Sequence, residues 1–260
     1  MKTVIPPGEH DYAIAEGALA SASLPAFDWQ AEPVGERCLL VRVGRTVGVD
    51  TSRIVHAVAA LLHEGLGAAV LDVVPAFTTV AVHFQPAAFP RRAGPASVQV
   101  ARKVERLLGK GVRATAGSGR VVEVPACYGG DHGPDLVEVA RRCKLTPQEV
   151  IALHSSRPLT VYAFFFSPGN PFAGPLDARL DIPRRSTPRT LVPAGSVGVA
   201  GGITSIYQNA SPGGWNIIAR TPLNLFDLKA MPPTRMQPGD LIHFRPVSPE
   251  QFGQLLEARP

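Results

Sequence analysis

Glycine and proline together make up nearly a fifth of this 260-residue sequence, with 25 and 26 residues respectively. Because both residues weaken or end helices, the chain cannot be a bundle of long helices. Their abundance is typical of folds with many short strands and tight turns. Hydrophobic residues form 45% of the sequence, which is enough for one large or two small cores. We therefore expect a folded protein rich in β-structure.

Charge, hydropathy and cysteine usage narrow the class of protein. The net charge is +5, but the basic residues are scattered and not interleaved with aromatic residues, which argues against nucleic-acid binding. No apolar window is long enough for a membrane span, and the N-terminus lacks the basic and apolar run of a signal peptide. The cysteines form no CxxC pair and are odd in number, which is typical of a reducing compartment. Together, the charge, the hydropathy and the cysteines lead us to expect a cytoplasmic protein without a nucleic-acid or membrane partner.

The first half of the chain has the pattern of a small α/β domain. Residues 1–35 are expected to be an extended arm without regular structure, whose Phe27 and Trp29 dock on the body. Apolar periodicity then predicts a strand, a helix capped by Asp50, two strands, a second helix and a closing strand, over residues 37–43, 50–65, 69–74, 78–84, 95–109 and 120–124. This order is that of the split βαβ, ferredoxin-like pattern, and we assign it to residues 36–118.

The second half, residues 119–260, has a different pattern. Two short helices are expected first, one from Asp135 to about Cys143 and one that begins at Thr146 with a capping box to Glu149. A last helix follows Ser248 by the same capping logic. Between them lie short strands bounded by proline or glycine, over residues 159–166, 196–200, 203–207, 215–220 and 240–246. Strands at this spacing suggest a barrel, so the fold class is α+β.

Arginines are the most concentrated polar residues of the second half. Guanidinium groups that converge on one cleft would hold a carboxylate or a phosphate in a fixed pose. The alternative is that each arginine faces water or pairs with Asp177 or Asp181. The cluster consists of Arg179, Arg184, Arg185, Arg189 and Arg220.

Two further residues are candidates for chemistry. His154 is either a general acid or base, or a group that bonds to its own helix end, where the helix dipole favours its protonated form. Ser196 fits a relaxed nucleophile-elbow pattern, but a proline turn precedes it and a β pattern follows, so a turn that places its hydroxyl or amide near a ligand is the better interpretation. The histidine spacings predict no metal site.

A glycine-rich turn, residues 211–214, precedes Trp215 and allows close approach of the backbone to a ligand. We interpret this turn, with the Trp215 indole just after it, as one lip of a pocket. The alternative is a hairpin corner with the indole ring in the core.

With these residues in view, the chain resembles the carboxyltransferase-domain family, subdomains C and D, which includes the B-type subunit of 5-oxoprolinase, the Kip-type kinase inhibitor and allophanate hydrolase subunit 1. The resemblance covers roughly residues 36–247 and is strong after residue 121. So many matches in the same order are more specific than any single short motif. The matching segments are Tyr128-Gly129-Gly130, Gly133-Pro134-Asp135-Leu136, Leu153-His154-Ser155-Ser156, Pro183-Arg184-Arg185, Pro188-Arg189, Val192-Pro193-Ala194-Gly195-Ser196-Val197, Ser211-Pro212-Gly213-Gly214-Trp215 and Pro238-Gly239-Asp240.

The resemblance implies a ferredoxin-like N-terminal domain followed by a cyclophilin-like β-barrel. It implies a subunit of a 5-oxoprolinase-like complex that opens a lactam with ATP, which the complex binds, and that works with a homologous carboxyltransferase subunit of the subdomain A and B type. By this analogy a small anionic substrate lies among the candidate residues. His154 and Arg189 would be catalytic, and the substrate-binding residues would be Arg184, Arg185, Ser196, Tyr207, Trp215 and Arg220.

The chain departs from the family pattern at three places, where Asn170, Ile203 and Arg220 stand. These departures leave the substrate open. The alternatives are a non-catalytic regulatory or scaffold subunit, such as a histidine-kinase inhibitor, and a component of an allophanate hydrolase or urea carboxylase type of enzyme.

Overall fold

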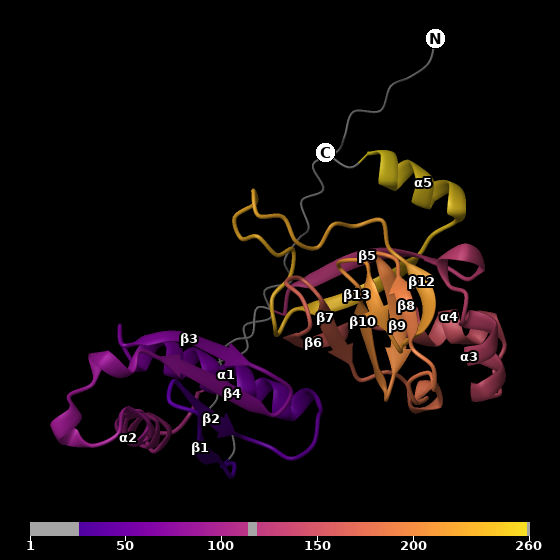
Figure 1. Ribbon diagram of the computed structural model, residues 1–260. Coiled ribbons are helices and arrows are strands. Elements are labelled where there is room, and N and C mark those ends of the chain that lie inside the picture. The colour runs from indigo at the N-terminus through magenta and orange to yellow at the C-terminus, as the bar shows by residue number, and fades with distance from the viewer. Residues whose placement is uncertain (1–25, 114–118, 259–260) are drawn as a thin grey trace.

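A computed structural model describes residues 26–113 and 119–258 of the chain. The described residues form two bodies with separate hydrophobic cores, a smaller N-terminal domain and a barrel domain that lie beside each other (Figure 1). The predicted domain boundary falls next to residues 114–118, which lie outside the described residues, as do residues 1–25 of the predicted arm.

The N-terminal domain is a four-stranded antiparallel sheet with two helices packed on it. The strand order is β1-β2-β4-β3. The helices bury apolar residues at helical spacing, among them Val55, Val58 and Leu62 in the first helix and Val100 and Val104 in the second. The elements are β1 (Gln30–Val34), β2 (Cys38–Arg42), α1 (Val49–Gly65), β3 (Val70–Pro75), β4 (Thr79–Phe84) and α2 (Ala96–Leu108).

Three predictions for this domain are wrong. The closing strand expected at residues 120–124 belongs to the barrel, where Val121 to Ala126 pair with the strand that begins at Leu241. The edge position beside β2 is taken by β1, which lies inside the segment predicted to be an arm without regular structure. Asp50 is not the cap of α1, because the cap is Gly48 and no side chain caps the helix. Phe27 and Trp29 do pack against the core, as expected.

The second domain is a closed seven-stranded barrel, in agreement with the barrel predicted from the spacing of the strands. The strands follow one another around the barrel as β10-β7-β6-β13-β5-β12-β9, and β13 with β5 is the one parallel pair of the described wall. The wall consists of β5 (Val121–Tyr128), β6 (Leu159–Phe164), β7 (Pro171–Gly174), β9 (Ser196–Ala200), β10 (Ile203–Ile206), β12 (Asn216–Arg220) and β13 (Leu241–Pro246). A two-stranded ribbon of β8 (Arg189–Val192) and β11 (Ser211–Gly213) lies outside this wall.

The helices of the barrel domain are α3 (Leu136–Cys143), α4 (Pro147–Ser155) and α5 (Pro249–Glu257). Both predicted capping boxes are present, between Thr146 and Glu149 and between Ser248 and Gln251. Short 3₁₀ turns occur at Pro86–Ala88, Arg91–Ala93, Gly130–His132 and Ala178–Leu180. None of the helices in the described residues is both long and apolar enough to cross a membrane.

Candidate functional site

The alternation of side chains along the barrel strands separates two environments. On β10, Thr204 and Ile206 face the barrel interior, where Ile206 joins the main core. Their neighbours Ile203 and Ser205 face the other way, toward the outer side of the wall. Because successive side chains of a strand point to opposite faces, this one strand contributes both to the core and to an external cavity.

His154 belongs to the interior of the barrel. It is fully buried, and burial lowers the pKa of its imidazole to about 3. Thr204 donates its hydroxyl hydrogen to the Gly198 carbonyl at 3.0 Å, so its oxygen accepts from Nε2–H of His154 at 3.0 Å. Nδ1 of His154 then accepts from the Tyr128 hydroxyl at 2.7 Å. Desolvation outweighs the helix dipole here, so the imidazole is neutral and each of its nitrogens has a partner inside the core.

A cavity of about 590 Å³ lies on the outer side of the wall, between the barrel and the N-terminal domain. Phe77, from the turn between β3 and β4, and Val47, just before α1, form its N-terminal wall. Phe77 packs on the barrel residue Phe172 with ring centres 5.9 Å apart, edge to face. Aromatic side chains dominate the lining, which is typical of ligand pockets with a few oriented polar groups. The barrel side of the lining is Phe165, Phe166, Asn170, Phe172, Arg184, Pro188, Gly201, Ile203, Ser205, Tyr207, Pro212, Gly213, Gly214 and Trp215.

Trp215 lines this cavity, in agreement with the predicted pocket lip, and Tyr207 lines it as well. The hydroxyl of Tyr207 accepts a hydrogen bond from the backbone N–H of Trp215, and burial raises the pKa of the phenol. Gly213 is needed at this point, because a Cβ atom there would lie 2.8 Å from ring carbons of Tyr207. The hydroxyl of Ser205, also in the wall, is buried without a hydrogen-bond partner among the described residues.

Arg184 is the one cation that lines the described cavity. Its guanidinium group lies over the Trp215 ring, 5.6 Å from the ring centre, a cation–π contact. The next residue, Arg185, points the opposite way in this extended loop and donates from Nη1 to Oδ1 of Asp135 at 2.8 Å. Adjacent arginines thus serve two different sites.

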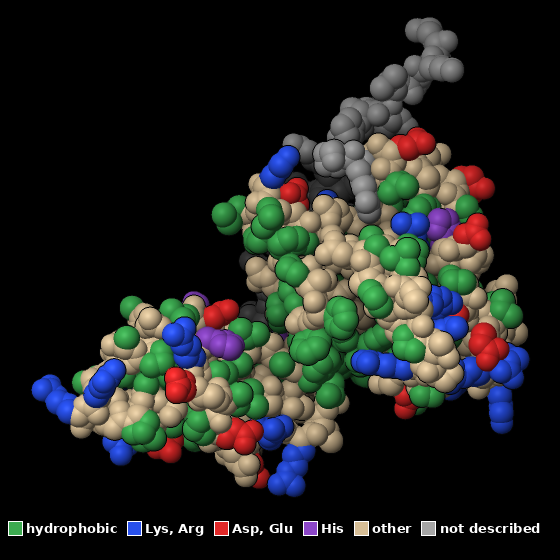
Figure 2. Space-filling model, in the orientation of Figure 1, with side chains coloured by type: hydrophobic (Ala, Val, Ile, Leu, Met, Phe, Trp, Pro, Cys, Tyr) green, Lys and Arg blue, Asp and Glu red, His purple; other side chains and the backbone are tan. Residues whose placement is uncertain are grey.

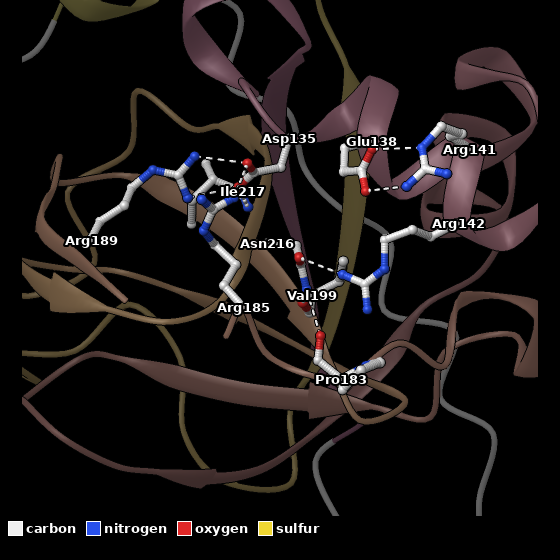
Figure 3. Close-up of polar contacts among 10 residues, drawn as sticks. All are labelled: Asp135, Glu138, Arg141, Arg142, Pro183, Arg185, Arg189, Val199, Asn216 and Ile217. Carbon is white, nitrogen blue, oxygen red and sulfur yellow. Dashed lines mark hydrogen bonds and ion pairs between the residues drawn. The ribbon is translucent and has the colours of Figure 1, made fainter. Parts of the chain in front are cut away.

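Arg189 joins Arg185 on the carboxylate of Asp135 (Figure 3). Its two terminal nitrogens donate to the two carboxylate oxygens at 2.8 and 2.7 Å, a bidentate pair that raises the pKa of Arg189. Asp135 is buried and accepts a fourth hydrogen bond from the backbone N–H of Ile217 at 2.7 Å. The arginines do converge on an anion, but this anion is a side chain of the protein itself.

Asp135 is positioned by the turn before α3. Its backbone N–H donates to the Ile217 carbonyl at 2.9 Å, and Gly133 lies so close to the Ile218 carbonyl that no Cβ atom would fit. Although Asp135 is the N-cap residue of α3, its side chain does not cap the helix. It instead joins α3, β12 and the loop before β8.

The remaining predicted site residues lie apart from the cavity. Ser196 is buried at the start of β9, after a turn, as the interpretation of its sequence context predicted. Arg220 donates from Nε to the Ala194 carbonyl at 2.8 Å, and Arg179 pairs with Asp177 at 2.9 Å. Of the eight residues proposed from the sequence, the cavity therefore brings together Arg184, Tyr207 and Trp215.

The prediction missed several residues of the site, among them Phe77, Phe172, Ser205 and Asp135. Phe77 comes from the other domain and Asp135 pairs with residues 50 and 54 positions away. A local pattern carries no information on such distant pairs. Among the described residues, no cluster of three His, Cys, Asp or Glu side chains could hold a metal ion.

The chain matches known proteins along most of its length. Residues 29–236 match the family described as the carboxyltransferase domain, subdomain C and D, and the chain belongs to this family. It is 37% identical over 228 residues to the B-type subunit of 5-oxoprolinase from Bacillus subtilis, and the match covers 86% of this chain and 95% of that protein.

Solved structures share the fold. The crystal structure of TTHA0988 has a TM-score of 0.70 and 34% identity, and the match covers 82% of this chain. The chain spans only 40% of the length of TTHA0988. The urea amidolyase of K. lactis has a TM-score of 0.68 at 17% identity, covering 92% of this chain and 16% of that chain, so it supports the fold alone.

Proposed function

We propose that this chain is a subunit of a 5-oxoprolinase-like complex that hydrolyses a lactam or amide bond at the expense of ATP, together with a homologous carboxyltransferase subunit. The observation that carries the proposal is the 37% identity to the B-type subunit of 5-oxoprolinase along 95% of that protein. The domain organisation is part of the proposal: the predicted N-terminal domain, residues 36–118, gains β1 at its sheet edge, and residues 119–260 are a cyclophilin-like barrel domain. All three cysteines are free, which supports a cytoplasmic location.

The cavity between the two domains is the proposed substrate site. A guanidinium group binds a carboxylate strongly, and Arg184 is held at the cavity wall by the Trp215 ring. The hydroxyl of Ser205 lacks a partner among the described residues, and a rotation of its side chain toward the cavity would let it bond to a lactam or carboxylate oxygen. A small anionic substrate would thus be oriented by a cation and a hydroxyl against an aromatic surface. In this proposal the Asp135 cluster does not bind substrate, because an internal carboxylate already occupies Arg185 and Arg189.

The cavity lacks the groups that amide hydrolysis requires. No Asp, Glu, His, Lys or Cys is among its described lining residues, and the pKa of Tyr207 is raised. General acid–base catalysis needs a group that exchanges a proton near the working pH. In this proposal the partner subunit supplies that group, and His154 and Arg189 have no direct catalytic role.

The same cavity does not fit ATP. A triphosphate is normally held by several cations or by a glycine-rich cradle of backbone N–H groups. The described lining offers the single guanidinium of Arg184. We therefore assign no nucleotide to this cavity, and in this proposal ATP is bound elsewhere in the complex.

The experiment is reconstitution of the complex. This chain and its subdomain A and B homologue from the same genome, with the further subunit that the family's 5-oxoprolinase includes, are purified and assayed for ATP hydrolysis dependent on 5-oxo-L-proline. We expect turnover by the complex and none by this chain alone. Turnover with urea or allophanate in place of 5-oxoproline would favour the urea-type alternative. A complex that forms but turns over none of the three would favour a regulatory or scaffold subunit.

A further inference from the structure

An exposed apolar turn borders the cavity. Phe165 and Phe166 line the cavity, yet their side chains are 58% and 75% exposed. Phe166 also has a left-handed backbone conformation, with φ of 78°, which is strained for a bulky residue. The turn is held rigid by Asn170, whose side chain donates to the Phe165 carbonyl at 3.0 Å and accepts from the Gln208 backbone N–H at 3.3 Å. The fold thus keeps the Phe165 and Phe166 side chains exposed to water, and the strained backbone at Phe166 adds to the energetic cost.

A second apolar loop projects next to this turn (Figure 1). At its tip Leu228 and Met231 are 83% and 95% exposed. Its neck is closed by a bridge between Phe226 and Thr234. The Gln208 side chain ties the loop to the turn, because it accepts from Leu225 N–H at 3.0 Å while its own backbone bonds to Asn170.

The turn and the loop belong to one side of the molecule. Gly169 of the turn packs on the neck of the loop, where a Cβ atom would lie 2.8 Å from Cβ of Phe226. Figure 2 shows hydrophobic side chains gathered on this side of the barrel domain, from the projecting loop to the junction of the two domains. We call Phe165, Phe166, Leu228 and Met231 the mouth face. Large exposed apolar patches held by rigid backbone are typical of interaction surfaces, with aromatic side chains as anchors.

We propose that the mouth face docks a second, different polypeptide, which covers the cavity and brings to it the carboxylate or histidine that its lining lacks. This inference rests in part on the proposed function. The incomplete lining argues for a partner at the mouth rather than elsewhere. A second copy docked through its own mouth face would bring the same cavity lining, which contains no carboxylate or histidine among its described residues.

The comparisons favour the same occupant. In TTHA0988 the region that matches this chain is joined to further protein, because it makes up only 40% of that chain. The Bacillus subtilis relative is named a subunit, which places it in an assembly. We therefore commit to the subdomain A and B homologue from the same genome as the partner.

The test measures binding of the purified homologue to this chain by biolayer interferometry. The variants are Phe166→Asn, since asparagine tolerates the left-handed backbone, and Met231→Asp. The matched control is Val137→Asp, because Val137 is 72% exposed on α3, away from the mouth face. We expect each mouth-face variant to weaken binding at least tenfold and the control to stay within about twofold of the wild type. Unchanged thermal melting of the variants confirms that they fold.

Each outcome decides the proposal. Wild-type affinity in both mouth-face variants would overturn it, as would the absence of any complex. If the wild-type chain instead forms a homodimer that these substitutions dissociate, the occupant is a second copy and the proposal is wrong. Binding that depends on the mouth face in a complex without turnover would support the docking surface while refuting the proposed function. Turnover by the complexes of both variants, with affinity unchanged from the wild type, would support the proposed function and refute the docking surface.

Discussion

Replacement of Asp135 by asparagine tests the account of the arginine cluster. The substitution removes the negative charge that accepts from Arg185, Arg189 and Ile217, and it places an NH₂ group against one of the guanidiniums. Removing one partner of a buried ion pair typically costs about 3–5 kcal/mol. The guanidinium side chains remain 34% and 26% exposed, so water offsets part of the loss. We expect the barrel domain to be destabilised by about 2–4 kcal/mol.

Urea unfolding measures this loss. The chain has two tryptophans, Trp29 in the N-terminal domain and Trp215 in the barrel domain. In a Trp29→Phe background, fluorescence reports on the barrel alone. With a denaturant slope of roughly 2 kcal/mol per molar urea, Asp135→Asn should lower the midpoint by about 1–2 M. The control is Asp177→Asn, which removes an exposed ion pair with Arg179 and should barely move the midpoint.

The reasoning fails if Asp135→Asn unfolds within about 0.3 M urea of the parent protein. The cluster would then be a loose surface arrangement, and its arginines would be available to a ligand. The same conclusion would follow if the parent protein itself bound a small anion at the cluster, because Asp135 should already occupy the guanidinium groups of Arg185 and Arg189.

Two other predictions concern the barrel core and the cavity wall. Burial lowers the pKa of His154 from 6.5 to about 3. Between these pH values the unfolded state therefore binds more protons than the folded state. The stability contributed by the neutral His154 is complete above about pH 6.5 and is lost as the pH falls toward 3. The unfolding free energy of His154→Gln, compared with the wild type by urea titration from pH 7 to pH 4, should therefore fall less steeply; parallel curves would contradict this. Gly213→Ala should displace the Tyr207 ring and destabilise the barrel by about 1–3 kcal/mol. It should also weaken 5-oxoproline binding by the complex, measured by calorimetry. An unchanged affinity would show that the Tyr207 ring does not shape the site.

Much of the fold could be predicted because its signals are local. The capping boxes at Thr146 and Ser248 lie within four residues of chain, and both helices begin there. The closing strand failed for the opposite reason. Val121 pairs in parallel with Leu241, 120 residues later. The apolar sequence of a strand does not show which sheet the strand joins. The sequence order of a ferredoxin-like pattern was present, but the edge of the N-terminal sheet was already filled by β1.

The candidate site was predicted in part. The glycine-rich turn indicated a lip at Trp215, and the structure shows that Gly213 is needed there because the backbone lies close to the Tyr207 ring. The arginines were expected to act together, yet Arg184 and Arg185 face different sites since they are adjacent in an extended loop. No sequence pattern distinguished Asp135, a helix N-cap residue, from an ordinary cap.

The most direct test of the proposed substrate site is the KM for 5-oxo-L-proline in the reconstituted complex. Arg184→Gln removes the cation of the cavity, whereas Arg220→Gln removes one that bonds to the Ala194 carbonyl outside it. We expect Arg184→Gln to raise the KM at least tenfold and Arg220→Gln to leave it unchanged, since a charge-assisted contact to a carboxylate is worth about 1.5–3 kcal/mol. An unchanged KM in Arg184→Gln would contradict the assignment of the substrate to the cavity between the two domains.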